Sequence, residues 1–185
     1  SVEQFSKLKE YCTKKGILFL VTPFDEVSLD ELDSLDLEAY KVSSTDLTNL
    51  PFLKKIAQKK KPMILSTGMS YLEEVRLALE EILPYNKNVI LLHCTANYPV
   101  QDQEVNLNAL KTLAENFDIL LGYSDHTVGI GASPYAVPYG IKVLEKHFTL
   151  DKKMQGPDHE ASLDIPELKK YVEEVRRVEK YMGSA

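Results

Sequence analysis

The stretch Ile119-Leu120-Leu121-Gly122-Tyr123-Ser124-Asp125-His126 joins a short apolar run to a polar end. Its first three residues are typical of a buried strand, and its end carries a hydroxyl, a carboxyl and an imidazole group. Runs of the same kind recur along the chain, each followed by a small polar residue or by a polar segment that contains a histidine. Together they cover residues 17–21, 40–42, 63–65, 89–92, 119–121 and 143–144. We predict a strand at each of these six places.

Segments with helical spacing separate the predicted strands. They cover residues 49–58, 71–83 and 105–116, and a last one covers residues 166–182. Apolar strands that alternate with amphipathic helices indicate a parallel sheet buried on both faces. Pro134 and Pro138 interrupt the segment between the last two strands, so we expect that helix to be kinked or broken.

The spacing of the strands favours a closed barrel over an open sheet. From Thr22 to Ser44 is 22 positions, and from Ser66 to Thr95 is 29. The reactive residues follow the strands, at the rim where barrels build their active sites. No Gly-x-Gly-x-x-Gly or Walker-type loop occurs. We predict one domain, residues 1–185, with an α/β fold of the (β/α)8 TIM-barrel type and about six of the eight βα units present.

Composition and charge exclude several classes of partner. The chain of 185 residues has a net charge of −6, which argues against nucleic acid or an anionic membrane as a partner. Cys12 and Cys94 lack the spacing of a zinc site or a disulfide framework, and no apolar stretch approaches the roughly 20 residues that span a bilayer. We expect a soluble, cytoplasmic protein. Because a helical pattern begins almost at Ser1, we also expect that end to be a cut or processed boundary.

Two histidines end successive predicted strands. His126 follows the fifth strand and His147 follows the sixth, so their side chains are candidates for one shared site. Neutral imidazoles are good ligands for Mn, Zn or Fe, and two of them leave positions for water and substrate. A single histidine after a strand is more often structural, so a metal or catalytic pair and a structural role both stay open.

Hydroxyl groups follow several of the strands. Hydroxyls, backbone amides and one ammonium group are what a bound phosphate needs, although Ser and Thr after strands also commonly cap helices. The candidate residues are Thr22, Lys41, Ser44, Ser66 and Ser124.

Two loops on the same rim carry further polar residues. Asp158, in a Gly-Pro-Asp sequence, is a candidate for binding sugar hydroxyls or part of an ordinary turn. Tyr98 is a candidate for the wall of a sugar site or for loop packing. His93 precedes Cys94 on one strand, so their side chains face opposite ways and we expect His93 to be buried and hydrogen-bonded.

Five motifs in this sequence resemble the sialic acid synthase family. That family includes N-acetylneuraminate, legionaminic and pseudaminic acid synthases and the spore-coat polysaccharide synthases. The resemblance covers nearly the whole chain, in order and in spacing. The motifs are Ile64-Leu65-Ser66-Thr67-Gly68-Met69, Leu91-Leu92-His93-Cys94-Thr95, Tyr123-Ser124-Asp125-His126-Thr127, Glu145-Lys146-His147-Phe148-Thr149 and Gly156-Pro157-Asp158.

The resemblance implies an enzyme that joins phosphoenolpyruvate to an N-acetylated amino-sugar aldehyde of the N-acetylmannosamine type. The products are a nonulosonic (sialic) acid and phosphate, which leaves by C–O cleavage. It implies that His126 and His147 hold Mn²⁺, with Mg²⁺ or Co²⁺ as alternatives, and that they are catalytic together with Lys41. Thr22, Lys41, Ser44, Ser66 and Ser124 are then expected to bind phosphoenolpyruvate, and Tyr98, Glu145 and Asp158 the amino sugar.

The chain also departs from the family. The family usually carries Gly-Ser-Gly-Glu or a relative where this chain has Ser43-Ser44-Thr45-Asp46, so Asp46 is expected to alter sugar specificity. The family's first two strands, which carry a glutamate and a lysine of the site, would precede Ser1. A carboxy-terminal antifreeze-like domain would follow Ala185.

These departures keep two other hypotheses open. One is a barrel fragment that binds phosphoenolpyruvate and metal but needs a complementing chain, or self-association of its open edges, for turnover. The other is a metal-dependent aldolase or isomerase on a similar barrel. The serine motifs favour the synthase.

Overall fold

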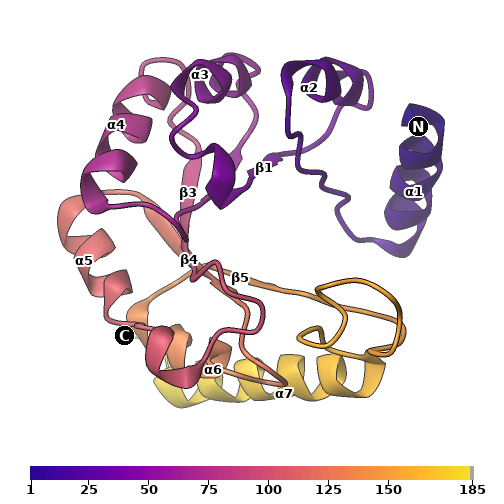
Figure 1. The fold of residues 1–185 in the computed structure, drawn as a ribbon, viewed down its shortest axis with the longest axis vertical. Coiled ribbons are helices and arrows are strands. Elements are labelled where there is room, and N and C mark those ends of the chain that lie inside the picture. Colours follow the sequence, from indigo (N-terminus) through magenta and orange to yellow (C-terminus); the bar gives the residue numbers. More distant parts are fainter. Residues whose placement is uncertain (184–185) are drawn as a thin grey trace. The chain divides into compact units, whose positions relative to one another are not determined.

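The computed structural model describes residues 1–183 (Figure 1). The chain divides into two compact units, of which the first is Ser1–Ile90 and the second begins at Leu91. Parallel strands alternate with helices along the chain, as predicted. Within residues 1–183 these strands are β1 (Tyr40–Val42), β2 (Met63–Ser66), β3 (Val89–His93), β4 (Leu120–Asp125) and β5 (Val143–Lys146).

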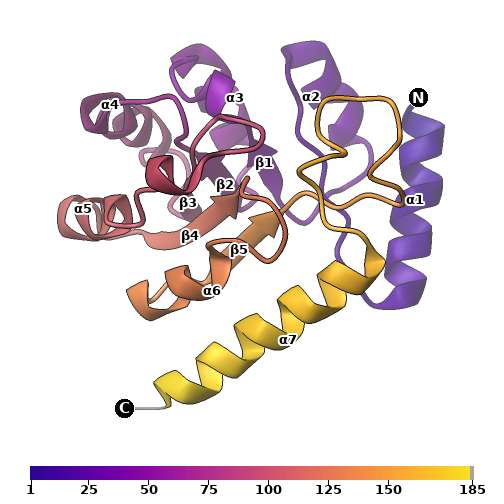
Figure 2. The same ribbon diagram turned by 60° about the horizontal axis from the view of Figure 1, so that its bottom comes forward.

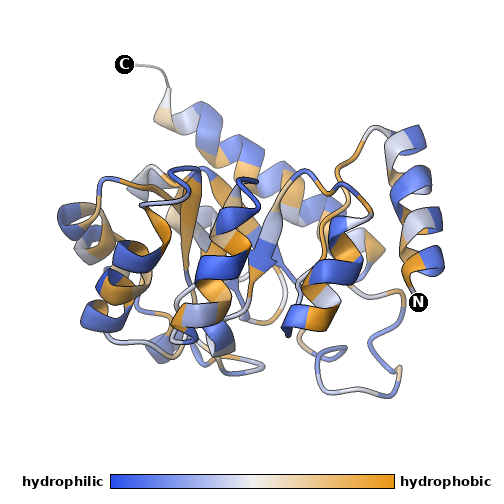
Figure 3. Cartoon of the chain, turned by 90° about the horizontal axis from the view of Figure 1, so that it is seen from above, coloured by the Kyte–Doolittle hydropathy of each residue, from blue (hydrophilic) through white to orange (hydrophobic). Residues whose placement is uncertain are grey.

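The first unit is built on amphipathic helices that cover a pair of strands. The short 3-10 turn η1 (Ser44–Asp46) follows β1. The helices α3 and α4 each bury one apolar face. Figure 3 shows hydrophilic and hydrophobic residues interspersed along the helices. These two helices pack against each other. The helices of this unit are α1 (Val2–Lys15), α2 (Glu26–Asp33), α3 (Leu50–Gln58) and α4 (Leu72–Ile82).

The register of β1 and β2 decides which side chains share a face. Tyr40 pairs with Met63 and Val42 with Leu65, and all four side chains are buried. Because side chains alternate along a strand, Lys41 lies on the opposite face. Lys41 pairs with Ile64, and Ser66 is two residues after Ile64, so Ser66 lies on the same face as Lys41 at the end of β2.

The second unit contains the paired strands β4 and β5 and a long terminal helix. That helix, α7 (Ile165–Met182), starts at the capping residue Asp164 and packs along the broken segment before β5 (Figure 2). Its buried residues Tyr171 and Val175 form a cluster with Leu163. The remaining elements are η2 (Asp102–Glu104), α5 (Ala109–Asn116), α6 (Ser133–Ala136) and η3 (Val137–Tyr139).

Gly122 lets β4 approach its neighbours closely. A Cβ atom at this position would lie 2.6 Å from the carbonyl oxygen of Val143 and in contact with Leu92 Cδ2. Only a residue without a side chain fits between these groups.

Two expectations about the elements have different outcomes. The helix that carries Pro134 and Pro138 is broken, as predicted, because each proline is the second residue of a separate short helix, α6 or η3.

The strand predicted at residues 17–21 is not confirmed, since residues 17–24 carry no strand in the described structure. A strand needs a paired neighbour, and here Ile17 and Leu18 are instead 60% and 71% exposed. The described part of the chain therefore shows five strands, and the prediction of six βα units is not confirmed.

Candidate active site

Lys41, Ser66 and Ser44 gather at the carboxyl ends of β1 and β2 in the first unit. Lys41 Nζ donates a hydrogen bond to Ser66 Oγ at 2.7 Å and another to the carbonyl oxygen of Val42 at 3.0 Å. Ser44 Oγ accepts a hydrogen bond from the backbone N–H of Gly68 at 2.9 Å. One ammonium, two hydroxyls and the backbone after β2 thus lie together, which is a donor set suited to an oxyanion.

The local sequence explains this cluster. Val42 and Leu65 anchor the two strands in the core, and Ser66 follows directly with only 4% of its surface exposed. After β1, Ser43 lies at the N-cap of η1 and accepts from the N–H of Thr45, which places Ser44 at the start of that turn.

Thr22 does not join the cluster. No hydrogen bond links it to Lys41, Ser44 or Ser66 in the described structure. It lines a separate hollow beside α1 and α2, with Phe5 and Ser28 among the other lining residues. Thr22 follows the segment at residues 17–21, which was expected to be a strand and is not one in the described structure. Its place beside the other candidate residues depended on that strand.

His126 and His147 lie side by side in the second unit. Their ring centroids are 5.4 Å apart. The two residues directly follow β4 and β5, which pair in parallel with Asp125 opposite Lys146, so the histidines occupy the next register position. Tyr98 completes an aromatic cluster, with its ring 4.1 Å from that of His126 and 5.4 Å from that of His147.

The hydrogen bonds of His126 select one tautomer. Its Nδ1 lies 2.7 Å from the carbonyl oxygen of Thr95, which can only accept, so Nδ1 carries the proton. The Nε2 atom then keeps its lone pair and lies 3.3 Å from Ser124 Oγ. Burial lowers the pKa of His126 below its usual range, although the bond to Thr95 opposes this shift. A neutral imidazole with an oriented Nε2 is the form that ligates metals.

Carboxylates border the histidine pair. Ser124 Oγ donates to Glu145 Oε1 at 2.7 Å, between residues that are opposite each other in the register of β4 and β5. Burial raises the pKa of the Tyr98 phenol, and the negative charges of Asp158 and Glu145 add to that shift. Hydrogen bonds and ring contacts therefore bring Tyr98, Ser124, Glu145, His126 and His147 into one region of the second unit.

The donor set fits a metal in part. Within residues 1–183, no group of three His, Cys, Asp or Glu side chains is arranged to hold an ion. His126 and His147 offer two imidazoles, which would leave the other coordination positions to water or substrate oxygens.

His93 has the structural role that the sequence predicted. It is buried, and its Nε2 lies 2.9 Å from the carbonyl oxygen of Val105. Burial lowers its pKa, and its ring stacks on Tyr123 at 5.7 Å. Cys94 is also buried, and it forms no disulfide bond in the described part of the chain.

Sequence reasoning missed a buried ion pair behind the histidines. Lys146 Nζ lies 3.2 Å from Asp125 Oδ1, and both side chains are almost fully buried. The signal was available, because Asp125 and His126, like Lys146 and His147, are adjacent and so face opposite sides of the sheet. What the sequence could not show is that the two charged residues are opposite each other.

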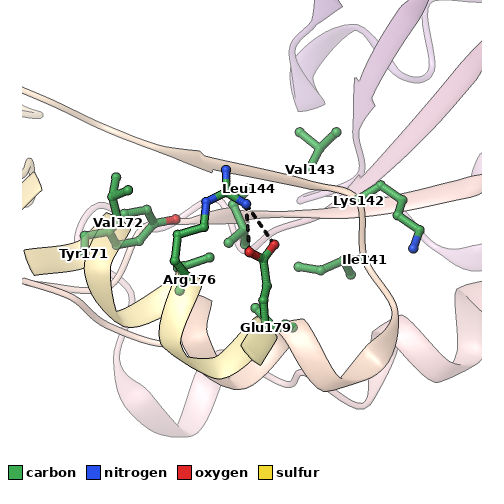
Figure 4. A pocket seen from close by; sticks show the side chains of 10 residues that line it. Ile141, Lys142, Val143, Leu144, Tyr171, Val172, Arg176 and Glu179 are labelled. Atoms are coloured by element: carbon green, nitrogen blue, oxygen red, sulfur yellow. Dashed lines mark hydrogen bonds and ion pairs between the residues drawn. The ribbon is translucent and has the colours of Figure 1, made fainter. Parts of the chain in front are cut away.

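A pocket on another side of the second unit contains none of the predicted site residues. It lies between the start of β5 and α7, and its lining includes Ile141, Leu144, Tyr171 and the ion pair of Arg176 with Glu179 (Figure 4). The residues that the sequence predicts to bind phosphate, metal and sugar are therefore not among the residues that line this pocket.

Comparison with known proteins assigns the chain. The model of the NeuB family matches residues 1–185. The chain belongs to the NeuB family. It is 47% identical over 189 residues to N,N'-diacetyllegionaminic acid synthase of Legionella pneumophila, covering 100% of this chain and 53% of the relative. It is 40% identical over 185 residues to human N-acetylneuraminate-9-phosphate synthase, covering 100% of this chain and 52% of the relative.

A solved structure supports the assignment of this NeuB-family chain. The crystal structure of N-acetylneuraminic acid (sialic acid) synthetase from Leptospira borgpetersenii, in complex with citrate, matches with a TM-score of 0.96 and 37% identity. The match covers 100% of this chain and 65% of that one. The chain spans about half the length of the curated relatives it matches. In residues 1–183, no helix has the length and apolar character that crossing a membrane requires.

Proposed function

We propose that this NeuB-family chain carries most of the ligand-binding residues of a synthase that condenses phosphoenolpyruvate with an N-acetylated amino-sugar aldehyde. The products would be a nonulosonic acid and phosphate. The observation that carries the proposal is the pairing of His126 with His147, in which the Thr95 carbonyl leaves the His126 Nε2 lone pair available. The synthase names of relatives at 40% and 47% identity support the reaction class.

The cluster in the first unit would bind the phosphate group. The Lys41 ammonium supplies positive charge, and Ser66, which accepts a hydrogen bond from Lys41, can donate its own O–H to a phosphate oxygen. Ser44 is fixed by the Gly68 N–H in the same cluster. Thr22 and Ser124 remain proposed phosphoenolpyruvate ligands that the described contacts do not join to these residues.

His126 and His147 would hold a divalent metal, of which Mn²⁺ is the first candidate. When bound, such an ion supplies Lewis-acid polarisation of the aldehyde oxygen. The chain itself would orient the metal ligands. The carbonyl oxygen of Thr95 fixes the tautomer of His126, and Glu145 accepts a hydrogen bond from the Ser124 hydroxyl, which lies beside His126 Nε2. Tyr98, Glu145 and Asp158 would contact the amino sugar, with a phenol and two carboxylates suited to hydroxyl and amide groups.

The test follows the bridging oxygen of phosphoenolpyruvate. The chain is incubated with Mn²⁺, N-acetylmannosamine and phosphoenolpyruvate that carries ¹⁸O between carbon and phosphorus. C–O cleavage predicts released phosphate that contains the label. Unlabelled phosphate would contradict the proposed chemistry.

Binding of phosphoenolpyruvate without any release would favour the second candidate function. In that case the chain would be a fragment that binds its ligands and needs a complementing chain for turnover. The observation that favours this candidate is the half-length coverage of the curated relatives. Adding a separately expressed amino-terminal segment of a longer relative would then restore release.

A further inference from the structure

The buried ion pair of Asp125 and Lys146 lies on the face of the β4–β5 pair opposite to the histidines. Lys146 Nζ is 3.2 Å from Asp125 Oδ1, and the exposed fractions of the two side chains are 3% and 0%. Lys146 also donates to the backbone carbonyl and the hydroxyl of Thr127. A buried charge pair of this kind is retained at a large desolvation cost, which is compensated only when its remaining hydrogen bonds are satisfied.

The Asp125 carboxylate is fully engaged. Oδ1 accepts from the N–H of Thr127 at 2.9 Å and from its hydroxyl at 2.6 Å. Oδ2 accepts from the N–H of Ser133 at 2.9 Å and from its hydroxyl at 2.7 Å. The segment from Thr127 to Ser133 therefore folds over the carboxylate and ties β4 to the start of α6.

Gly131 allows this segment to fold so tightly. Its φ of +63° lies in the left-handed region, and a Cβ atom there would contact Thr127 Oγ1 and lie 3.0 Å from Asp125 Oδ2. The carboxylate is thus enclosed by backbone and hydroxyl groups in fixed positions, and it presents a defined site to the ammonium of Lys146.

The register of the two strands connects this pair to the histidines. Asp125 pairs with Lys146, and Ser124 pairs with Glu145. Since neighbouring residues point to opposite faces, the ion pair lies on one face while His126 and His147 meet on the other. A slip of one residue between β4 and β5 would move one member of each pair to the wrong face.

We propose that Asp125 and Lys146 are positioning residues, whose ion pair holds β4 and β5 in the register that brings the two imidazoles together. Apolar residues in these positions would fill the same space but would not distinguish one register from the next. A charge pair does distinguish them, because any slip leaves two buried charges unpaired. The role in metal binding rests on the proposed function, whereas the role in ring proximity does not.

The test uses the double variant Asp125→Asn/Lys146→Met, which removes both charges and leaves no isolated buried ion. The matched control is Tyr171→Phe, which removes a hydrogen bond to Ser133 at the edge of the same network without touching the charge pair. Both variants are made in the full chain, and folding is checked by circular dichroism. The single variant Lys146→Met is measured as well, if it folds.

The first measurement needs no metal. In the unsubstituted chain, nuclear Overhauser contacts are expected between the ring protons of His126 and His147, whose centroids are 5.4 Å apart. The folded double variant should lose these contacts, and Tyr171→Phe should keep them. A folded double variant that keeps them would overturn the proposal.

The second measurement is calorimetric titration with Mn²⁺. We expect the double variant to lose affinity by about 10-fold or more, and Tyr171→Phe to stay within about 2-fold of the unsubstituted chain. Mn²⁺ affinity unchanged in the double variant would contradict the positioning role. If the unsubstituted chain itself does not bind Mn²⁺, the proposed function fails, and the ring contacts alone then decide the inference.

Discussion

The imidazole rings of His126 and His147, 21 residues apart in the sequence, lie 5.4 Å apart in the structure at the ends of two paired parallel strands. Their proximity follows from parallel pairing, which aligns the carboxyl ends of β4 and β5. The same pairing places Glu145 against Ser124. The proximity of the two histidines is therefore a consequence of strand pairing and not of their spacing in the sequence.

Replacing either member of the pair by alanine should remove most of the affinity for Mn²⁺. His126→Ala and His147→Ala each delete one of two imidazoles, and we expect losses of about 100-fold or more by calorimetry. His93→Ala is the matched control, because this histidine lies at the end of β3, is buried, and is hydrogen-bonded to the carbonyl oxygen of Val105. It should lower stability by about 1–3 kcal/mol and leave Mn²⁺ affinity unchanged. Equal affinities in all three variants would rule out the assignment.

Lys41→Met should weaken phosphoenolpyruvate binding while leaving Mn²⁺ binding intact. The substitution removes the ammonium that lies 2.7 Å from Ser66 Oγ, and a charge-assisted contact of this kind is worth about 1.5–3 kcal/mol, or about 10- to 100-fold in affinity. Lys87→Met, at an exposed lysine of the same unit, is the control for the loss of charge. Similar losses in both variants would mean that Lys41 acts only through the net charge.

The stability of the chain should fall as the pH drops below the ordinary pKa of histidine, in part because of His93. Burial lowers the pKa of His93 in the folded state, so the unfolded chain binds a proton at a higher pH than the folded chain does. The contribution to stability is thus present above about pH 6.5, the pKa of an unperturbed histidine, and is lost as the pH falls from there through the folded pKa. Urea unfolding at pH 7.5 and pH 5 measures it. His93→Gln should show a smaller difference between the two pH values, and an unchanged difference would contradict this explanation.

Gly122→Ala should destabilise the second unit. The added Cβ would meet the Val143 carbonyl oxygen at 2.6 Å as well as Leu92, and backbone atoms cannot move aside cheaply. We expect a loss of about 1–3 kcal/mol in the free energy of unfolding, measured with urea. Gly129→Ala is the control, because a Cβ there meets nothing within 4 Å, although its φ of +65° carries some strain. A smaller loss for Gly122→Ala than for Gly129→Ala would contradict the close approach of the strands.

The sequence was sufficient for the elements whose apolar pattern is complete. Residues 40–42 and 63–65 were predicted as strands and are β1 and β2, because their alternate residues fill the core. The prediction failed at residues 17–21, where an apolar run lacks a paired neighbour in the described structure. Apolar composition alone does not make a strand, since the backbone must also be paired.

The candidate site was predictable to a similar extent. The positions of the residues at strand ends were enough to predict that His126 lies near His147 and Lys41 near Ser66, and the structure shows both contacts. Thr22 was expected near Lys41 but lines the hollow beside α1 and α2. Its expected position depended on the strand at residues 17–21, which is not formed in the described structure. For the charge pair behind the histidines, the sequence indicated that Asp125 and Lys146 face away from His126 and His147, but not that they are opposite each other, because the register of two strands cannot be read from the sequence.

The most direct test of the account is calorimetric titration of the chain with phosphoenolpyruvate, in the absence and in the presence of Mn²⁺. We expect saturable binding at one site, stronger with Mn²⁺, and weakened by Lys41→Met with or without the metal. Absence of binding under both conditions would contradict the account and leave the site residues without a demonstrated ligand.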